Sequence, residues 1–244
     1  MTKTILIIFS IILLFNLGLY MHQSKKRKDE NMSKTGDTIT LPKPEFDSKT
    51  SLEEALKNRR SVRSFKDKPL KIEHISQLLW AAYGITKRVP EGPDYLRGGF
   101  RSAPSAGALY PLEIYLQVSN VSGLKAGIYK YNSKEHTLSI HVAGDKSEQL
   151  GEAALNQPHV TQAPANIVYT AVFERTTQKY GERGKKRYIP MEIGHSSENV
   201  YLQAESLEIG TCAVGAFNDQ KVKKVIQTEN QEVPLYIMPL GYPK

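Results

Sequence analysis

The chain has 244 residues, of which 40% are hydrophobic and 24% are charged, and it holds a single cysteine. Such a composition excludes disorder throughout the chain, an intrachain disulfide framework and a cysteine-rich metal site. The net charge of +8 favours anionic partners, but much of the excess lies in two short runs, residues 25–28 and 183–186. Charge alone therefore does not indicate binding to nucleic acid.

The amino-terminal segment is apolar. Residues 4–21 are almost uncharged over about the length that spans a bilayer, which predicts a single membrane helix. A signal peptide is the alternative, although no small-residue cleavage site follows the apolar run. The basic residues 25–28 come directly after it and place the main domain on the cytoplasmic side, with export left open. We expect an anchor over residues 1–22, a polar and basic linker over residues 23–43 and a folded domain over residues 44–244.

Helical signals come first in the folded domain. Ser51 and Glu54 form a capping box, and Leu52, Ala55 and Leu56 recur at the spacing of a helix with one buried face. We therefore expect a short helix here, packed on the core through these three apolar side chains.

Hydrophobic periodicity predicts both helices and strands further along the chain. Gly84 ends an apolar helical pattern, and a polar turn separates the two halves of a hairpin. Because helices interrupt the strands without regular strand–helix–strand alternation, we expect a layered α+β fold rather than a doubly wound one. The predicted elements are helices over residues 72–82 and 191–207, strands over residues 112–119, 165–173 and 235–240, a hairpin over residues 127–144 and a helix capped by Asp145 and Glu148.

A cationic stretch follows the first helix. Residues 58–65, NRRSVRSF, hold three arginines and two serines, which either solvate a helix end or bind a phosphate through guanidinium forks and hydroxyls. The chain has neither of the usual glycine-rich nucleotide loops, so a phosphate here would be held by side chains. Two loops of small residues, within 101–116 and 209–219, would let the backbone approach a flat ligand closely.

Taken in order, these stretches resemble the nitroreductase-like family of FMN-dependent oxidoreductases and, within it, the branch of SagB/ThcOx-type dehydrogenases. The resemblance runs from about Leu41 to Pro243. It implies a nitroreductase-like α+β fold with a central, mainly antiparallel sheet flanked by helices, and an interlocked homodimer with FMN at the subunit interface. The matching motifs are LPKP, SLEEALKNRRSVRSF, LLWAAYGIT, RSAPSAGALYPLEIY, GIYKY, APANIVYTAVFERTTQKYGERG, EIGHSSENVYLQAESLEIGTCAVGAFND and PLYIMPLGYP.

The resemblance also implies which residues contact FMN. The arginine stretch matches the phosphate site, one loop of small residues reaches the isoalloxazine ring from the other subunit, and the second presents a backbone N–H to N5. Relatives place further basic residues after the last glycine, whereas this chain ends in GYPK, so Lys244 is the candidate there. The implied contacts are Arg59, Arg60, Ser61 and Arg63 for the phosphate and ribityl chain, Pro104, Ser105, Ala106 and Gly107 for the ring, Asn156 and Gln157 for the flavin edge, and Val214, Gly215 and Ala216 near N5.

A Lys-Tyr pair bears on the reaction. By composition, residues 178–188, QKYGERGKKRY, are typical of a solvated basic loop. Azoline-oxidising members of the branch use a Lys-Tyr pair that Lys179 and Tyr180 resemble in place and identity. Oxidising a heterocycle needs a base that takes a proton from carbon, and nitro reduction needs none. The pair therefore favours Lys179 and Tyr180 as catalytic residues of a dehydrogenase that transfers hydride from an organic substrate or peptide heterocycle to FMN N5.

Two alternatives to this function remain. One is a ping-pong reductase that carries electrons from NAD(P)H to a nitro compound or quinone. The other belongs to a different class, a non-catalytic protein whose basic residues bind the membrane surface.

A metal site is weighed and set aside. Glu192, His195 and Glu198 recur at i, i+3 and i+6 on the longest predicted helix, a spacing that can present metal ligands from one face. No second helix carries such a set, so we expect a polar stripe at the dimer interface and no metal.

Overall fold

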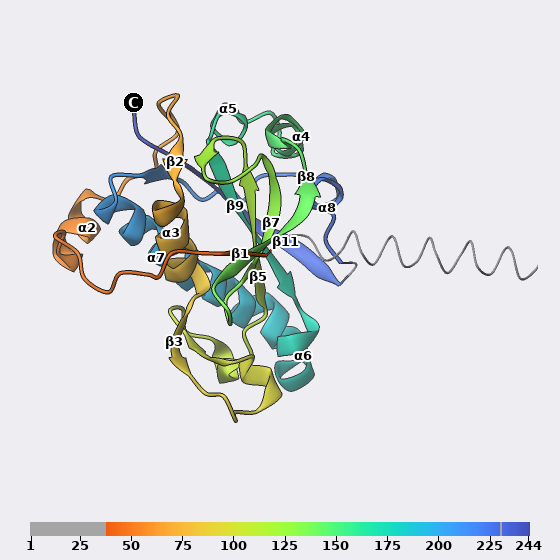
Figure 1. Cartoon of the computed structure of the whole chain (residues 1–244). Helices are drawn as coiled ribbons and strands as arrows, with labels where there is room; N and C mark the ends of the chain where they lie inside the picture. Colours follow the sequence, from red (N-terminus) through yellow and green to blue (C-terminus); the bar gives the residue numbers. More distant parts are fainter. Residues whose placement is uncertain (1–37, 230) are drawn as a thin grey trace, which may run out of the picture. The chain divides into compact units, whose positions relative to one another are not determined.

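A seven-stranded sheet forms the centre of the structure, a computed structural model that describes residues 38–229 and 231–244. Its strand order is β1-β8-β7-β5-β9-β11-β10, and all neighbouring pairs are antiparallel, which confirms the predicted α+β sheet (Figure 1). The strands are β1 (Thr38–Thr40), β5 (Leu112–Val118), β7 (Gly127–Asn132), β8 (Thr137–Ala143), β9 (Ala165–Val172), β10 (Gly210–Thr211) and β11 (Glu232–Gly241). Two short ladders are separate: β2 (Leu70–Lys71) with β6 (Val121–Ser122), and β3 (Ile85–Arg88) with β4 (Gly99–Arg101).

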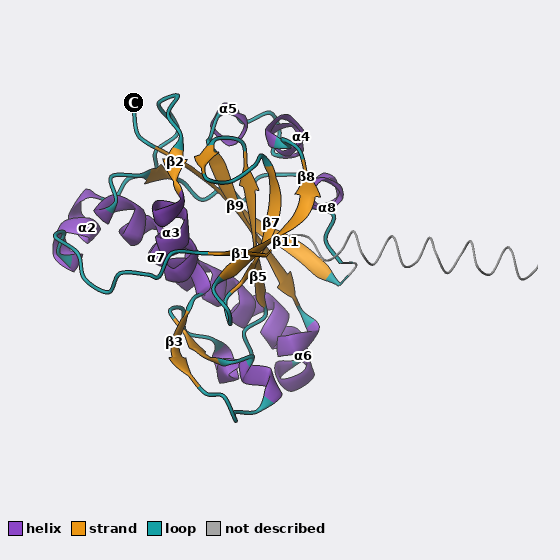
Figure 2. Ribbon diagram, in the orientation of Figure 1, coloured by secondary structure: helices purple, strands orange, loops and turns teal. Residues whose placement is uncertain are grey.

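Helices cover both faces of the sheet (Figure 2). The helices α3 and α7 belong to the core on one face, and α4, α5 and α8 belong to the core on the other. The helices are α2 (Leu52–Asn58), α3 (Ile72–Tyr83), α4 (Ser147–Ala153), α5 (Pro158–Thr161), α6 (Glu174–Tyr180), α7 (Ile189–Ser206) and α8 (Asp219–Ile226), with short turns η1 (Asp94–Leu96), η2 (Ala106–Ala108) and η3 (Gly184–Tyr188).

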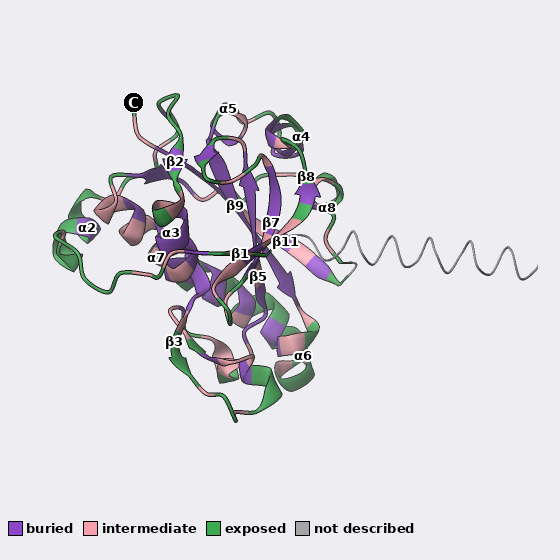
Figure 3. Ribbon diagram, in the orientation of Figure 1, coloured by how far each residue is buried: buried purple, intermediate pink, exposed green. Residues whose placement is uncertain are grey.

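The central strand β9 is buried at every position because successive side chains point into the two cores (Figure 3). Ile167 and Tyr169 belong to the core with α3 and α7, whereas Val168 belongs to the core with α4, α5 and α8. Burying an aliphatic side chain of this size contributes roughly 1.5–3 kcal/mol. The sheet is therefore held between two apolar cores, and the candidate site residues lie on the segments around it.

The helix α2 has its predicted cap but not its predicted packing. The Glu54 N–H donates to Ser51 Oγ at 3.1 Å, as a capping box requires. Ala55 is buried, but Leu52 and Leu56 are 60% and 54% exposed. The expectation that these two leucines pack on the core is wrong, because no element of the described part of the chain covers them.

Two further segments differ from the sequence-based expectation. β1 begins at Thr38, inside the stretch assigned to the linker, because Thr38 pairs with Ser139 of β8. Residues 178–188, expected to form a loop, are largely helical and belong to α6 and η3.

The expected membrane helix, residues 4–21, lies outside the described residues. Among residues 38–229 and 231–244, no helix is long and apolar enough to cross a bilayer. Within the described residues, the expected membrane localisation is therefore not supported.

Candidate functional site

The arginine stretch leaves α2 as an extended segment beside β10, an edge strand of the sheet. Ser61 forms a parallel bridge with Thr211, and the Val62 N–H donates to the Thr211 carbonyl at 2.9 Å. Alternate side chains of an extended segment point to opposite sides. The segment therefore separates Arg59, Ser61 and Arg63 from Arg60 and Val62.

Arg59 and Ser61 are positioned by α7. The Arg59 Nε lies 3.9 Å from Glu198 Oε1, and its guanidinium carbon lies 5.1 Å from the Tyr201 ring centre. Ser61 Oγ lies 3.2 Å from the Tyr201 hydroxyl. Arg63 is exposed, and its one side-chain hydrogen bond is a long one of 3.5 Å to the Ser61 carbonyl. Within the described residues, Arg63 therefore keeps most of its guanidinium donors available.

Arg60 lies apart from this group. Its guanidinium donates to the carbonyls of Lys57 and Arg59 at 3.0 and 2.8 Å. With Val62, Lys66 and other residues it lines a separate cavity of about 430 Å³ that Arg59, Ser61 and Arg63 do not line. The geometry does not bring Arg60 together with the other implied phosphate ligands.

The carboxyl terminus returns to the arginine stretch. Phe65 bridges Pro243, and the Lys244 N–H donates to the Ser64 carbonyl at 3.2 Å. The exposed Lys244 therefore adds a cation next to the arginines.

The loop after β10 supplies backbone donors. The Val214 N–H is used by the Ile237 carbonyl at 2.8 Å, so it is not available to a ligand. Gly215 and Ala216 are exposed, and within the described residues their N–H groups make no hydrogen bond. Gln157 Nε2 donates to the Ala216 carbonyl at 2.8 Å and braces this loop. Asn156 is exposed beside it, and its side-chain amide makes no hydrogen bond to the residues that the structure describes.

This first group of residues fits FMN. Arg59, Arg63 and Lys244 provide positive charge and Ser61 a hydroxyl, which suit a phosphate dianion. The Gly215 and Ala216 N–H groups and the Asn156 amide can hydrogen-bond the polar edge of a flat ring. We call residues 59, 61, 63, 156, 214–216 and 244 the arginine group.

A second group gathers around the loop Pro104–Gly107. Gly107 has a φ of 64°, and a Cβ placed there would lie 2.9 Å from the Tyr180 hydroxyl and 3.2 Å from Lys179 Nζ. The positive φ favours glycine here, and any larger residue would displace the ends of the Lys179 and Tyr180 side chains. The structure brings the loop and the Lys-Tyr pair together, as one catalytic region requires.

The Lys-Tyr pair has an aromatic and cationic setting. Lys179 Nζ lies 5.4 Å from the Tyr180 ring centre, and the Tyr180 ring meets the Tyr188 ring at 4.8 Å and 74°. Arg183 Nε donates to the Tyr188 hydroxyl at 3.0 Å. We call residues 104–107, 179 and 180 the lysine group. In the described part of the chain, no hydrogen bond or ion pair connects it to the arginine group.

Glu192 is a buried carboxyl that the sequence-based site did not include. It is 2% exposed, its Oε1 accepts from the Tyr83 hydroxyl at 2.5 Å, and its Oε2 accepts from the Ser105 hydroxyl at 2.6 Å. Burial raises the pKa of Glu192 to about 7, against the opposing effect of the two hydroxyls and of Arg101 and Arg97.

Glu192 does not belong to the predicted polar stripe. It is buried, whereas His195 and Glu198 are exposed. Its place between Ile189 and Ile193, on the buried side of α7, is the signal that could have identified it. Through Ser105, Glu192 fixes the loop of the lysine group.

Comparison with known proteins places the fold. A sequence model of the nitroreductase family matches residues 56–242. A Methanocaldococcus jannaschii protein named as a nitroreductase is 41% identical over 206 residues, which cover 84% of this chain and 98% of that protein. The NADPH-dependent FMN reductase of Bacillus subtilis is 24% identical over 203 residues, 78% of this chain and 65% of the reductase.

Two other similarities extend this comparison. The Escherichia coli microcin B17-processing protein McbC is 28% identical over 157 residues, 58% of this chain and 54% of McbC. A solved structure from Ralstonia eutropha, described as a nitroreductase, has a TM-score of 0.71 at 26% identity and covers 85% of this chain and 90% of its own. These relatives point to a flavin, FMN, as the cofactor. The chain belongs to the nitroreductase family and is an oxidoreductase.

Proposed function

We propose that this enzyme is an FMN-dependent dehydrogenase of the SagB type, which oxidises an organic substrate by removing a proton and a hydride. The observation that carries the proposal is the position of Lys179 and Tyr180 beside Gly107, where an added Cβ would meet both side chains, in the loop that the resemblance assigns to the flavin ring. Reduction of a nitro compound or a quinone needs no base that takes a proton from carbon, so it does not explain a Lys-Tyr pair at this position.

The arginine group holds the cofactor. FMN, when bound, supplies the hydride acceptor at N5. Arg59, Arg63 and Lys244 neutralise its phosphate, and Ser61 adds a hydroxyl donor. The Gly215 and Ala216 N–H groups, rather than that of Val214, are free to hydrogen-bond the ring.

The lysine group handles the proton. Lys179 Nζ, with the Tyr180 hydroxyl beside it, takes the proton from the substrate carbon as hydride leaves the substrate. The Tyr188 ring limits the positions open to Tyr180. Ser105, held by Glu192, keeps the loop against the pair.

A homodimer would join the two groups into one site. The loop of the lysine group would face the arginine group of the partner, as the resemblance implies. The exposed Leu52 and Leu56, one turn apart on α2, form an apolar strip that a second copy of the chain would cover. Exposed apolar side chains also lie near both groups. Leu155 is 61% exposed next to Asn156 of the arginine group, and Met191 is 53% exposed next to Glu192, which holds the loop of the lysine group.

The resemblance to azoline-oxidising members of the branch supports a substrate of the heterocycle class. Similarity to McbC, which is named for processing microcin B17, is consistent with that branch. We propose a small molecule or peptide that bears a reduced heterocycle as the substrate here.

The test compares Lys179→Ala and Tyr180→Phe with a control, Lys186→Ala, which removes a more exposed lysine of the same segment. Both test variants should keep the flavin absorbance and lose turnover of an azoline substrate by about 10²–10⁴-fold. Lys186→Ala should retain turnover. Full turnover in both test variants would show that the pair is structural.

A second candidate function is NAD(P)H-dependent reduction of nitro compounds or quinones. The relatives named as a nitroreductase and as an FMN reductase favour it. In that case the same variants should reduce a nitroarene with NAD(P)H as fast as the unmodified enzyme, and no azoline oxidation should be measurable in any of them.

A further inference from the structure

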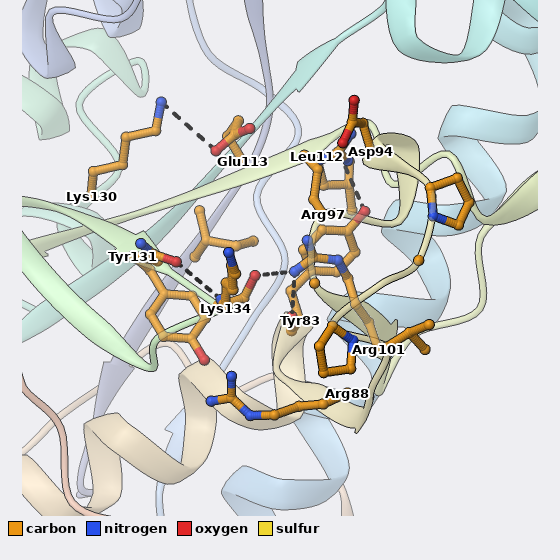
Figure 4. A pocket seen from close by; sticks show the side chains of 18 of the residues that line it. Tyr83, Arg88, Asp94, Arg97, Arg101, Leu112, Glu113, Lys130, Tyr131 and Lys134 are labelled. Atoms are coloured by element: carbon orange, nitrogen blue, oxygen red, sulfur yellow. Dashed lines mark hydrogen bonds and ion pairs between the residues drawn. The ribbon is translucent and has the colours of Figure 1, made fainter.

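A cavity of about 680 Å³ lies between the β3–η1–β4 segment and the turn that joins β7 to β8 (Figure 4). Figure 4 shows Lys130 and Tyr131 on one side of it and Arg97 and Asp94 on the other. Small-molecule sites in proteins have this size. The residues of the arginine group do not line it.

The wall of this cavity is cationic. It holds five basic side chains and two carboxylates, Asp94 and Glu113. Glu113 is already engaged, since its oxygens pair with Arg175 at 2.5 Å and with Lys130 at 3.7 Å. The basic residues are Arg88, Arg97, Arg101, Lys130 and Lys134.

Four of these cations have no carboxylate partner within the described residues. Lys130 is the exception, because it also pairs with the buried Glu232 at 2.9 Å. Arg97 donates to the carbonyls of Leu109 and Tyr110. Arg101 donates to the Tyr83 carbonyl and to Ser133.

Arg88 and Lys134 are the unengaged cations of the wall. Both are exposed, and no side-chain hydrogen bond or ion pair of either is found within residues 38–229 and 231–244. Their charges can therefore turn to a ligand without breaking a contact of the fold.

Like charges are crowded at the base of the cavity. Burial lowers the pKa of Arg97 to about 10, and the neighbouring charges of Arg175 and Arg101 act in the same direction. A bound anion would relieve this repulsion. The wall also offers apolar surface for an organic body, from Val89, Pro90, Pro93, Leu112 and Ile114.

We propose that this cavity is a binding site for a small organic anion that carries a phosphate group or several carboxylates. The three guanidinium groups match the oxygens of either acid, and the two lysines add positive charge. The site is separate from the arginine group and does not depend on the function proposed above.

Isothermal titration of the FMN-loaded protein tests this site, because loading occupies the arginine group with its own ligand. The probes are glucose 6-phosphate for the phosphate arm, citrate for the carboxylate arm and glucose as the uncharged control. At least one anion should bind at one per chain, more weakly as salt is added, and glucose should not bind.

Arg88→Ala/Lys134→Ala should weaken binding of that anion at least tenfold. The matched control, Lys49→Ala/Lys125→Ala, removes two exposed lysines outside the cavity and should leave the affinity unchanged. Unchanged flavin absorbance and circular dichroism establish that both double variants are folded.

Protection mapping gives a second readout. A bound anion should slow acetylation of Lys134 but not of Lys125, as measured by mass spectrometry. Absence of binding by both anions, or equal weakening in the two double variants, would overturn the proposal.

Discussion

At the scale of single residues, the arginine stretch is divided by its extended backbone. Arg63 is exposed with unused donors, whereas Arg60 donates to two carbonyls and lines a different cavity. Two arginines that look equivalent in NRRSVRSF therefore have different surroundings in the fold.

Replacing Arg63 with alanine should weaken FMN binding by roughly ten- to a hundredfold, since a charge-assisted contact is worth about 1.5–3 kcal/mol. Riboflavin, which lacks the phosphate, should bind the variant and the unmodified protein alike. Fluorescence titration measures both ligands. Arg60→Ala is the matched control and should bind FMN normally; an equal loss in the two variants would contradict the assignment.

The buried Glu192 makes stability depend on pH. Its pKa rises from 4.5 to about 7 in the folded chain, so the folded state binds more protons than the unfolded state between these values. The stability that Glu192 contributes is full below about pH 4.5 and falls by roughly 3 kcal/mol as the pH rises to about 7.

Glu192→Gln removes this titration. Urea unfolding midpoints of the two proteins are measured from pH 4.5 to 7.5. As the pH rises, the midpoint of the unmodified protein should fall relative to that of the variant. All other ionisable groups are the same in both proteins, so their effect cancels in the difference. A pH-independent difference would show that the Glu192 pKa is close to its usual value.

At the scale of elements, the pattern of apolar residues was sufficient to predict the longer helices and strands. The helices α3 and α7 and the hairpin β7–β8 were predicted from their apolar patterns, and β9 was predicted from a continuous apolar run. β1 was missed because three residues carry no pattern and are held by pairing with β8.

The prediction for α2 was half right for a physical reason. A capping box depends on local residues only, whereas the direction of an apolar face depends on what covers it. Glu192 was missed from the site for a related reason, since its partners, Tyr83 and Ser105, are distant in sequence. The grouping of Gly107 with Lys179 and Tyr180 likewise needed the tertiary structure.

The exposed leucines of α2 give a prediction for assembly. Leu52→Glu/Leu56→Glu should weaken a homodimer at least tenfold, because two charges would replace its apolar contact. Tyr95→Glu, at a residue that is 49% exposed in η1, is the control. Sedimentation velocity measures the dissociation constants; an unchanged dimer would place the interface elsewhere.

At the scale of the whole molecule, a complete active site needs both the arginine group and the lysine group. The arginine group surrounds the segment after α2 and the carboxyl terminus, and the lysine group surrounds α6 and the loop before β5. A homodimer that places each lysine group against the arginine group of the partner gives two complete sites.

Activity of a mixed dimer tests this arrangement most directly. One subunit carries Arg59→Ala/Arg63→Ala, the other carries Lys179→Ala, and two different affinity tags isolate the heterodimer. If the sites are shared, the dimer has one site with both groups intact and should recover about half the azoline turnover of the unmodified enzyme, far above either mutant homodimer. Turnover no higher than the average of the two homodimers would contradict the account, because each site would then lie within one subunit.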